Sequence, residues 1–126
     1  MTEYSSGVCN INPDESRKRF ISGVIGVLAA SVLSAIYIIQ SLNDYFLLIV
    51  LLAAVFGFQG LIQSRNNFCV AHALKGTEKT GKETEKVEEE ESNLKDKLFA
   101  RKLIIKAVLY GAAFTLTVFL VKNTLI

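Results

Sequence analysis

The chain has 126 residues, a formal net charge of +2 and an apolar fraction of 51%. Of its 14 Lys and Arg residues, all but Lys122 lie in residues 17–19 and 65–106. Such segregation argues against a soluble globular domain, whose helices carry charge along one whole face. The small net charge argues against a nucleic-acid-binding module, so we expect no nucleic acid among the partners.

Three stretches with almost no charge, residues 20–39, 45–62 and 103–121, predict membrane-spanning helices. The first has twenty residues, and at about 1.5 Å per residue it covers the roughly 30 Å hydrocarbon core of a bilayer. Within lipid the backbone polar groups of each span must pair internally, which favours a helix. We therefore expect an all-α integral membrane protein with three transmembrane helices.

This expectation divides the chain into four parts. A cytoplasmic tail with the first helix start covers residues 1–19, and a transmembrane hairpin covers residues 20–63. A cytoplasmic interfacial and charged segment covers residues 64–102, and the third transmembrane helix covers residues 103–126.

The basic residues predict the orientation in a plasma or inner membrane, or its equivalent. They flank the first span on its amino-terminal side and fill the long loop, whereas the turn of residues 40–44 has none. The positive-inside rule then places the N-terminus and the long loop inside and the C-terminus outside. The basic side chains expected at the membrane interface are Arg17, Lys18, Arg19, Arg65, Arg101, Lys102 and Lys106.

Two helix starts have capping signals. Asn12 precedes Pro13 and two acidic residues, so we expect the first helix to begin near Pro13 with Asn12 as its cap. Asn43 or Asp44 is expected to cap the second helix. The five-residue turn of residues 40–44 between the two spans predicts an antiparallel hairpin.

Small residues recur at helical spacing in each span, and they predict the faces on which the helices pack. Such stripes let helix backbones approach closely, which matters because lipid supplies no hydrophobic drive between helices. Alternatively, one of these stripes is a docking face for a partner subunit. Gly23 lies beside the stripe of the first span. The stripes are Ser22, Gly26, Ala30 and Ser34; Ala53, Gly57 and Gly60; and Ala107, Gly111 and Thr115.

The cytoplasmic segment begins with Phe68–Leu74, which predicts a short interfacial helix that ends at Gly76. Residues 77–95 predict a solvated helix or a partly disordered linker, with ion pairs Glu78–Lys82 and Glu91–Lys95. The acidic run Glu88–Glu91 is alternatively a contact for a basic soluble face of a partner. The last residues of the segment, 98–102, are expected to run straight into the third span.

Cys9, Cys69 and His72 are the candidate residues for thiol chemistry or metal binding. All three fall on the inner side in this orientation, where the cysteines are expected as free thiols. Cys69 and His72 are three residues apart and would share a helix face, so a thiol or metal site with Cys9 is one alternative. We otherwise expect no catalytic residues and no cofactor, because the spans lack a carboxylate and the chain lacks a phosphate-binding glycine loop.

Residues 1–76 resemble a family of small two-span inner-membrane proteins, some of which are fused to rhodanese domains. The resemblance rests on Cys9 and Asn10 before the basic helix start SRKRFISG, on the helical hairpin, and on Cys69 in FCVAHALKG. The family usually has a Cys-Pro pair where Cys69 and Val70 stand here. The resemblance implies a membrane location and a link to sulfur handling, and it assigns no catalytic residue.

These observations predict a non-enzymatic accessory or structural subunit of a larger integral-membrane complex. Its partners would be the lipid bilayer and other integral-membrane subunits. Two alternatives remain: a thiol or metal-binding membrane protein that uses Cys9, Cys69 and His72, and a self-assembling channel or small-molecule exporter.

Overall fold

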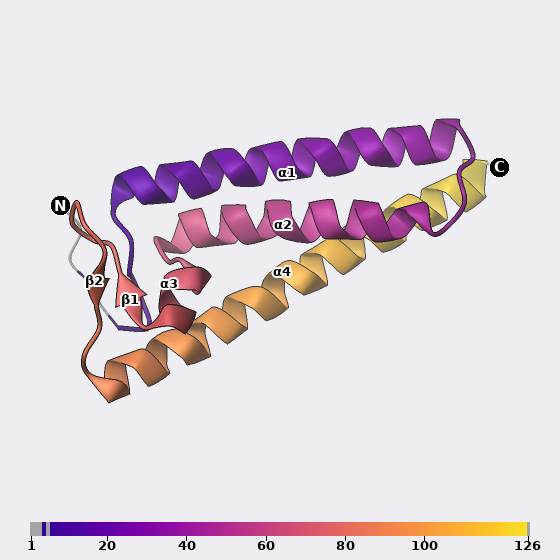
Figure 1. The fold of residues 1–126 in the computed structure, drawn as a ribbon. Coiled ribbons are helices and arrows are strands. Elements are labelled where there is room, and N and C mark those ends of the chain that lie inside the picture. Colours follow the sequence, from indigo (N-terminus) through magenta and orange to yellow (C-terminus); the bar gives the residue numbers. More distant parts are fainter. Residues whose placement is uncertain (1–3, 5, 126) are drawn as a thin grey trace.

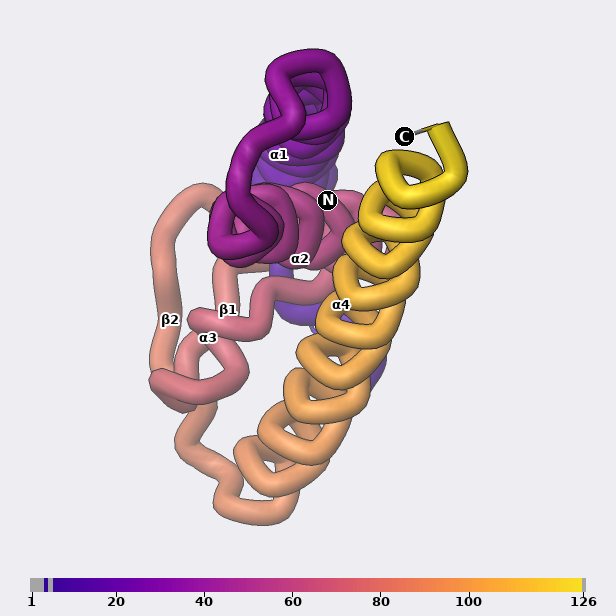
Figure 2. The backbone as a smooth tube through the Cα atoms, turned by 90° about the vertical axis from the view of Figure 1, so that its right-hand side faces the viewer, coloured from indigo at the N-terminus to yellow at the C-terminus, as the bar shows by residue number. Residues whose placement is uncertain are grey.

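The computed structural model describes Tyr4 and residues 6–125, and three long helices dominate this part of the chain (Figure 1). Helices α1 (Pro13–Ile39) and α2 (Phe46–Asn66) form an antiparallel hairpin. Helix α4 (Glu90–Leu125) runs back beneath it, packs mainly against α2 and meets α1 at few points. Figure 2 shows the resulting order, with α2 between the other two helices. Residues 1–3, 5 and 126, at the outer ends of the predicted tail and third span, lie outside the described residues.

All three helices are long and apolar enough to cross a membrane, which is consistent with a multi-pass membrane protein. Helix α4 has 36 residues and continues from the charged segment into the third apolar stretch without a break. This confirms that residues 98–102 lead straight into that stretch. At about 1.5 Å per residue the helix is about 54 Å long, so part of it extends beyond a 30 Å hydrocarbon core.

The predicted start of the first helix is confirmed. The Oδ1 atom of Asn12 accepts a hydrogen bond from the backbone N–H of Glu15 at 2.8 Å, and Pro13 occupies the first turn. The predicted cap of the second helix is wrong. Tyr45 occupies the cap position, and Asn43 instead accepts from the backbone N–H of Tyr45 at 3.0 Å, outside the helix.

Polar residues at one end of the molecule form a compact structure, of which the sequence analysis predicted the short helix but not the strands. A short helix α3 (Val70–Lys75) ends at Gly76, as predicted, with a φ of +73°. It is followed by strands β1 (Thr77–Glu78) and β2 (Glu85–Lys86), which pair antiparallel. The expected solvated helix or partly disordered linker at residues 77–95 is therefore wrong for the residues before Glu90, where α4 begins.

The two predicted ion pairs of this segment have different outcomes. Lys95 lies 3.8 Å from Glu91 between Nζ and Oε1, so the helical pair is confirmed. Glu78 instead accepts a hydrogen bond from the backbone N–H of Thr80 at 3.1 Å, because residue 78 belongs to a strand. Helical spacing does not bring Glu78 and Lys82 together in a β-hairpin.

Helix α3 packs on α4. Phe68, Val70 and Ala73 form a buried cluster with two residues of α4, Ala100 and Leu103. The rings of Phe68 and Phe99 also meet edge to face, with centroids 4.7 Å apart. This small core holds the polar end of the molecule against the amino-terminal half of α4.

Glycines set the close contact between α1 and α2. A Cβ atom on Gly26 would lie 2.6 Å from the Cα atom of Gly57, and one on Gly60 would lie 2.8 Å from the Cα atom of Gly23. The packing role predicted for Gly26, Gly57 and Gly60 is confirmed. The buried face of α1 passes through Gly23, Ala30 and Ser34, whereas Ser22 is half-buried beside it.

The contact between α2 and α4 depends on Gly111. A Cβ atom there would lie 3.1 Å from the backbone nitrogen of Val55. Ala107 is buried on the same face, as predicted, while Ala53 and Thr115 are half-buried at its edge. Two of the predicted small-residue faces therefore join α2 to its neighbours.

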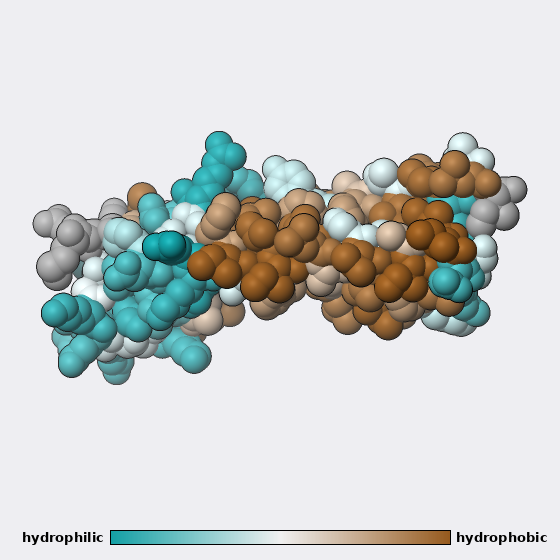
Figure 3. Space-filling model, turned by 90° about the horizontal axis from the view of Figure 1, so that it is seen from above, coloured by the Kyte–Doolittle hydropathy of each residue, from teal (hydrophilic) through white to brown (hydrophobic). Residues whose placement is uncertain are grey.

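The outer surface has separate hydrophilic and apolar regions. Figure 3 shows most hydrophilic residues gathered at one end, a long apolar surface along the helices, and a smaller hydrophilic area at the opposite end. At the far end, the Nζ atom of Lys122 donates to the carbonyl of Leu42 at 2.7 Å, which ties α4 to the α1–α2 turn. The start of α1, the end of α2, α3 and the start of α4 lie at one end of the molecule, and the α1–α2 turn and the end of α4 lie at the other (Figure 1).

Candidate functional site

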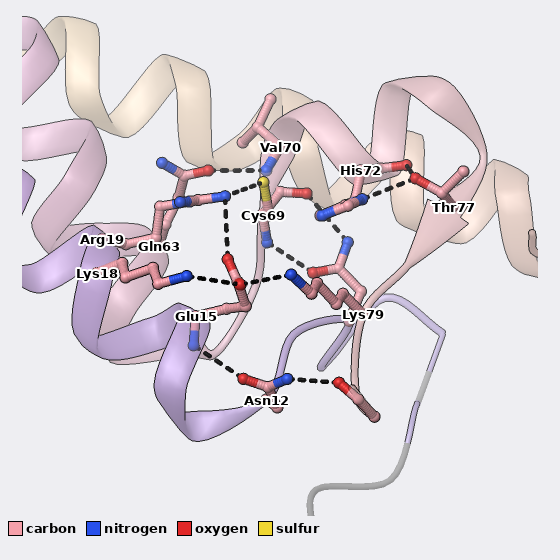
Figure 4. A network of polar contacts seen from close by, with 12 residues as sticks. Asn12, Glu15, Lys18, Arg19, Gln63, Cys69, Val70, His72, Thr77 and Lys79 are labelled. Atoms are coloured by element: carbon pink, nitrogen blue, oxygen red, sulfur yellow. Dashed lines mark hydrogen bonds and ion pairs between the residues drawn. The ribbon is translucent and has the colours of Figure 1, made fainter. Parts of the chain in front are cut away.

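The polar contacts at the junction of α1, α2, α3 and β1 centre on Glu15 (Figure 4). Its carboxylate accepts from Nζ of Lys79 at 2.8 Å and from Nζ of Lys18 at 3.3 Å, and Nη2 of Arg19 lies 3.9 Å away. The hydrogen bond from Lys79 lowers the pKa of Glu15. One carboxylate faces three cations, so this cluster carries a surplus of positive charge.

Asn10 joins the N-terminal segment to the start of α3. Its Oδ1 atom accepts from the backbone N–H of Cys69 at 2.6 Å, and its Nδ2 atom donates to the carbonyl of Cys69 at 3.0 Å. The backbone of the same segment also pairs with the residue after β1: the N–H of Asn12 donates to the carbonyl of Lys79 at 2.8 Å. Asn10 is fully buried, and its amide bonds to both backbone groups of Cys69.

Gln63 of α2 and Arg19 of α1 hold the same connection from the side of the long helices. The Oε1 atom of Gln63 accepts from the backbone N–H of Val70 at 2.8 Å. The Nη2 atom of Arg19 lies 3.4 Å from Sγ of Cys69, within hydrogen-bond distance for sulfur. Figure 4 shows the guanidinium between the carboxylate of Glu15 and the thiol.

The residues proposed for a thiol or metal site are held by separate partners. The thiol of Cys9 donates to the carbonyl of Ile11 at 3.5 Å, and burial raises its pKa. Nδ1 of His72 lies 2.8 Å from Oγ1 of Thr77, and burial, followed by the charge of Arg19, lowers the pKa of His72. Within the described residues, no group of three or more His, Cys, Asp and Glu side chains is placed to hold a metal ion.

A cavity of about 260 Å³ lies between α1, α2 and the start of α3. Its lining is polar at one end and apolar at the other. The amide nitrogen of Gln59 is buried and has no hydrogen-bond partner among the described residues. The residues that define the two ends are Arg19, Gln59, Gln63 and Cys69 at the polar end, with Ser22 and Phe56 beyond them.

The predicted interface residues gather around this end of the molecule. Arg17, Lys18 and Arg19 lie in the first two turns of α1, and Arg65 lies in the last turn of α2. All but Arg19 are exposed. Arg101, Lys102 and Lys106 lie exposed on α4, and the acidic run Glu88–Glu91 is exposed at its start.

Asn10, Glu15 and Gln63 are site residues that the sequence analysis missed as such. Asn10 precedes the helix cap, and Gln63 lies at the end of a span, where a polar residue is ordinary. Asn10 is distinguished only by its contact with Cys69, 59 residues away, and Gln63 only by its contact with Val70, seven residues away. An isolated buried amide leaves no periodic pattern to find.

No family model, curated protein or solved structure matches the chain. The resemblance of residues 1–76 to the two-span inner-membrane family therefore stays a prediction.

Proposed function

We propose that the protein is a non-enzymatic accessory or structural subunit of a larger integral-membrane complex. One observation carries the proposal: the helices lie side by side and leave most of their apolar surface uncovered. Only 28%, 28% and 17% of the most apolar windows of α1, α2 and α4 are buried within the chain. Lipid or neighbouring transmembrane helices must cover the remainder, because an apolar surface of this extent marks an interaction site.

Helix α4 is the favoured face for a neighbouring subunit. It is the least buried of the three long helices, and of the other two it packs extensively only against α2. Its outward side chains include Leu109, Leu116 and Leu120, all more than half exposed. These residues recur at intervals that place them along one side of the helix, as a packing surface requires.

Hydroxyl groups of the apolar stretches favour this proposal over a self-assembling channel. Ser31 donates to the carbonyl of Val27 at 2.9 Å, and Thr117 donates to the carbonyl of Ala113 at 2.8 Å. Side chains that bond to their own helix offer little polar surface to a water-filled pore. The same hydroxyls are compatible with lipid or a protein neighbour.

The proposal is tested by purifying the tagged full chain from its native membrane in mild detergent. We expect it to migrate with other integral-membrane proteins, identified by mass spectrometry, and to lose them in a Leu109→Ala/Leu116→Ala variant. A Glu83→Gln variant, changed in the exposed polar hairpin, serves as the control. Recovery of the 13.9 kDa chain alone would contradict the proposal, and a homo-oligomer would favour the channel alternative.

A further inference from the structure

The cavity between α1, α2 and α3 has the layout of a lipid headgroup site. Along α2 its lining passes from Gln63 through Gln59 to Phe56, which is more than half exposed in the apolar stretch. Along α1 it passes from Arg19 to Ser22. The cavity therefore joins the polar end of the molecule to its apolar surface, at the depth where a bilayer places phosphate groups.

Hydrogen-bond donors dominate the polar end of the cavity. The buried amide nitrogen of Gln59 has no partner among the described residues. The amide oxygen of Gln63 is used by the N–H of Val70, which leaves its NH₂ group as the donor. Arg19 adds a guanidinium with five N–H groups, and no carboxylate lines the cavity.

The charge around the cavity favours an anion. Arg19 shares the carboxylate of Glu15 with Lys18 and Lys79, so Glu15 neutralises one of three cations. The nearest Glu15 oxygen is 3.9 Å from Arg19, a looser contact than the 2.8 Å bond from Lys79. The guanidinium thus keeps both charge and donors for a further acceptor, and guanidinium groups match phosphate oxygens in geometry.

We propose that this cavity binds the phosphate group of an anionic membrane phospholipid. Arg19 and the amides of Gln59 and Gln63 bind the phosphate oxygens, and the glycerol and first acyl carbons lie against Ser22 and Phe56. The volume of about 260 Å³ leaves room for a group much larger than one water molecule, whose share of the liquid volume is about 30 Å³. The inference rests on the proposed membrane insertion and goes beyond the accessory role.

The test uses the full chain purified in mild detergent and three additives: phosphatidylglycerol, phosphatidylcholine and inorganic phosphate. Native mass spectrometry counts the lipid retained, and thermal unfolding measures the protection. We expect one phosphatidylglycerol per chain, a raised unfolding midpoint, and little effect of the other two. Loss of charge-assisted hydrogen bonds should weaken phosphatidylglycerol binding about tenfold or more in Arg19→Gln.

Two further variants separate binding from folding and from surface charge. Gln59→Leu removes an unpartnered buried amide, so it should fold as well as the wild type without lipid and still lose phosphatidylglycerol affinity. Arg17→Gln removes an exposed cation from the same helix, outside the cavity, and should keep full affinity.

Several outcomes would overturn the inference. Equal losses in Arg17→Gln and Arg19→Gln would mean general surface attraction, and an unchanged Gln59→Leu would mean that the cavity is not the site. Equal protection by inorganic phosphate or by phosphatidylcholine would mean that no anionic phospholipid is selected. If the chain is absent from the membrane fraction, the proposed function fails; if it is present and retains no lipid, only this inference fails.

Discussion

Buried polar side chains hold the polar end of the molecule through bonds to backbone atoms. Asn10 bonds to both backbone groups of Cys69, and Gln63 bonds to Val70. Asp96, which is 1% exposed, accepts from the backbone N–H of Gly7 at 2.7 Å. Such bonds fix irregular segments that have no helix or sheet of their own to satisfy their backbone groups.

Replacing Asn10 tests this view at the scale of one residue. Asn10→Ala leaves the buried N–H of Cys69 without its partner, which costs about 1–3 kcal/mol, whereas the carbonyl of Cys69 keeps the hydrogen bond from the N–H of Ala73. We expect a clearly lowered midpoint of thermal unfolding in detergent. Asn43→Ala, which removes an exposed bond to Tyr45 in the turn, should change the midpoint far less. Equal shifts for both variants would contradict this role of Asn10.

The long apolar helices α1 and α2 owe their close packing to glycines, which lack side chains. Gly23 and Gly26 of α1 meet Gly57 and Gly60 of α2 with backbone atoms in contact. Close approach of backbones maximises dispersion contacts, the main source of helix association where no hydrophobic drive exists. The polar elements form differently: α3 and the β-hairpin are short and depend on their contacts with α4 and the N-terminal segment.

A methyl group at Gly57 tests the helix contact. A Cβ atom there would lie 2.5 Å from the backbone nitrogen of Val27, which cannot move without shifting α1. Alanine favours a helix by about 1 kcal/mol over glycine, so a contact-free site would be stabilised by Gly57→Ala. We expect the opposite, a lowered unfolding midpoint by circular dichroism. Ala29→Val, on the exposed face of α1, adds more volume and should leave the midpoint near the wild-type value.

At the scale of the whole molecule, the two ends differ in composition and in the segments that they join. One end combines the N-terminal segment, α3, the hairpin and the start of α4, and it holds the basic segments. The other end joins the α1–α2 turn to α4 through Lys122, whose Nζ atom lies 3.6 Å from Asp44 and 4.2 Å from the ring centre of Tyr37. If the apolar helices cross a bilayer, these ends must face opposite compartments.

Cysteine labelling in intact cells tests this arrangement. Single cysteines at Glu88→Cys and Asn43→Cys, in a Cys9→Ala/Cys69→Ala background, mark exposed positions at the two ends. By the positive-inside rule we expect a membrane-impermeant thiol reagent to label position 43 in intact cells and position 88 only after permeabilisation. Labelling of both positions from the same side would contradict a three-span arrangement with the predicted orientation.

Features with a local or periodic signal were predictable from the amino-acid sequence. The three long apolar helices, the capped start at Asn12, the end of α3 at Gly76 and the continuous path of residues 98–102 into the third stretch follow from hydropathy and from residues a few positions apart. Glycine at helical spacing also indicated the contact faces, because few other reasons exist to place Gly26 and Gly57 inside apolar helices.

The tertiary structure decided what depends on distant partners. It set the register of α1, where Gly23 and not Ser22 lies in the contact, and it folded residues 77–86 into a hairpin beside Ile11. It also brought Arg19, Gln59 and Cys69 around one cavity. Hydropathy and spacing report whether each segment faces water or an apolar environment. The helix register, the cavity and the contact of the hairpin with Ile11 arise instead from segments tens of residues apart, which no local pattern encodes.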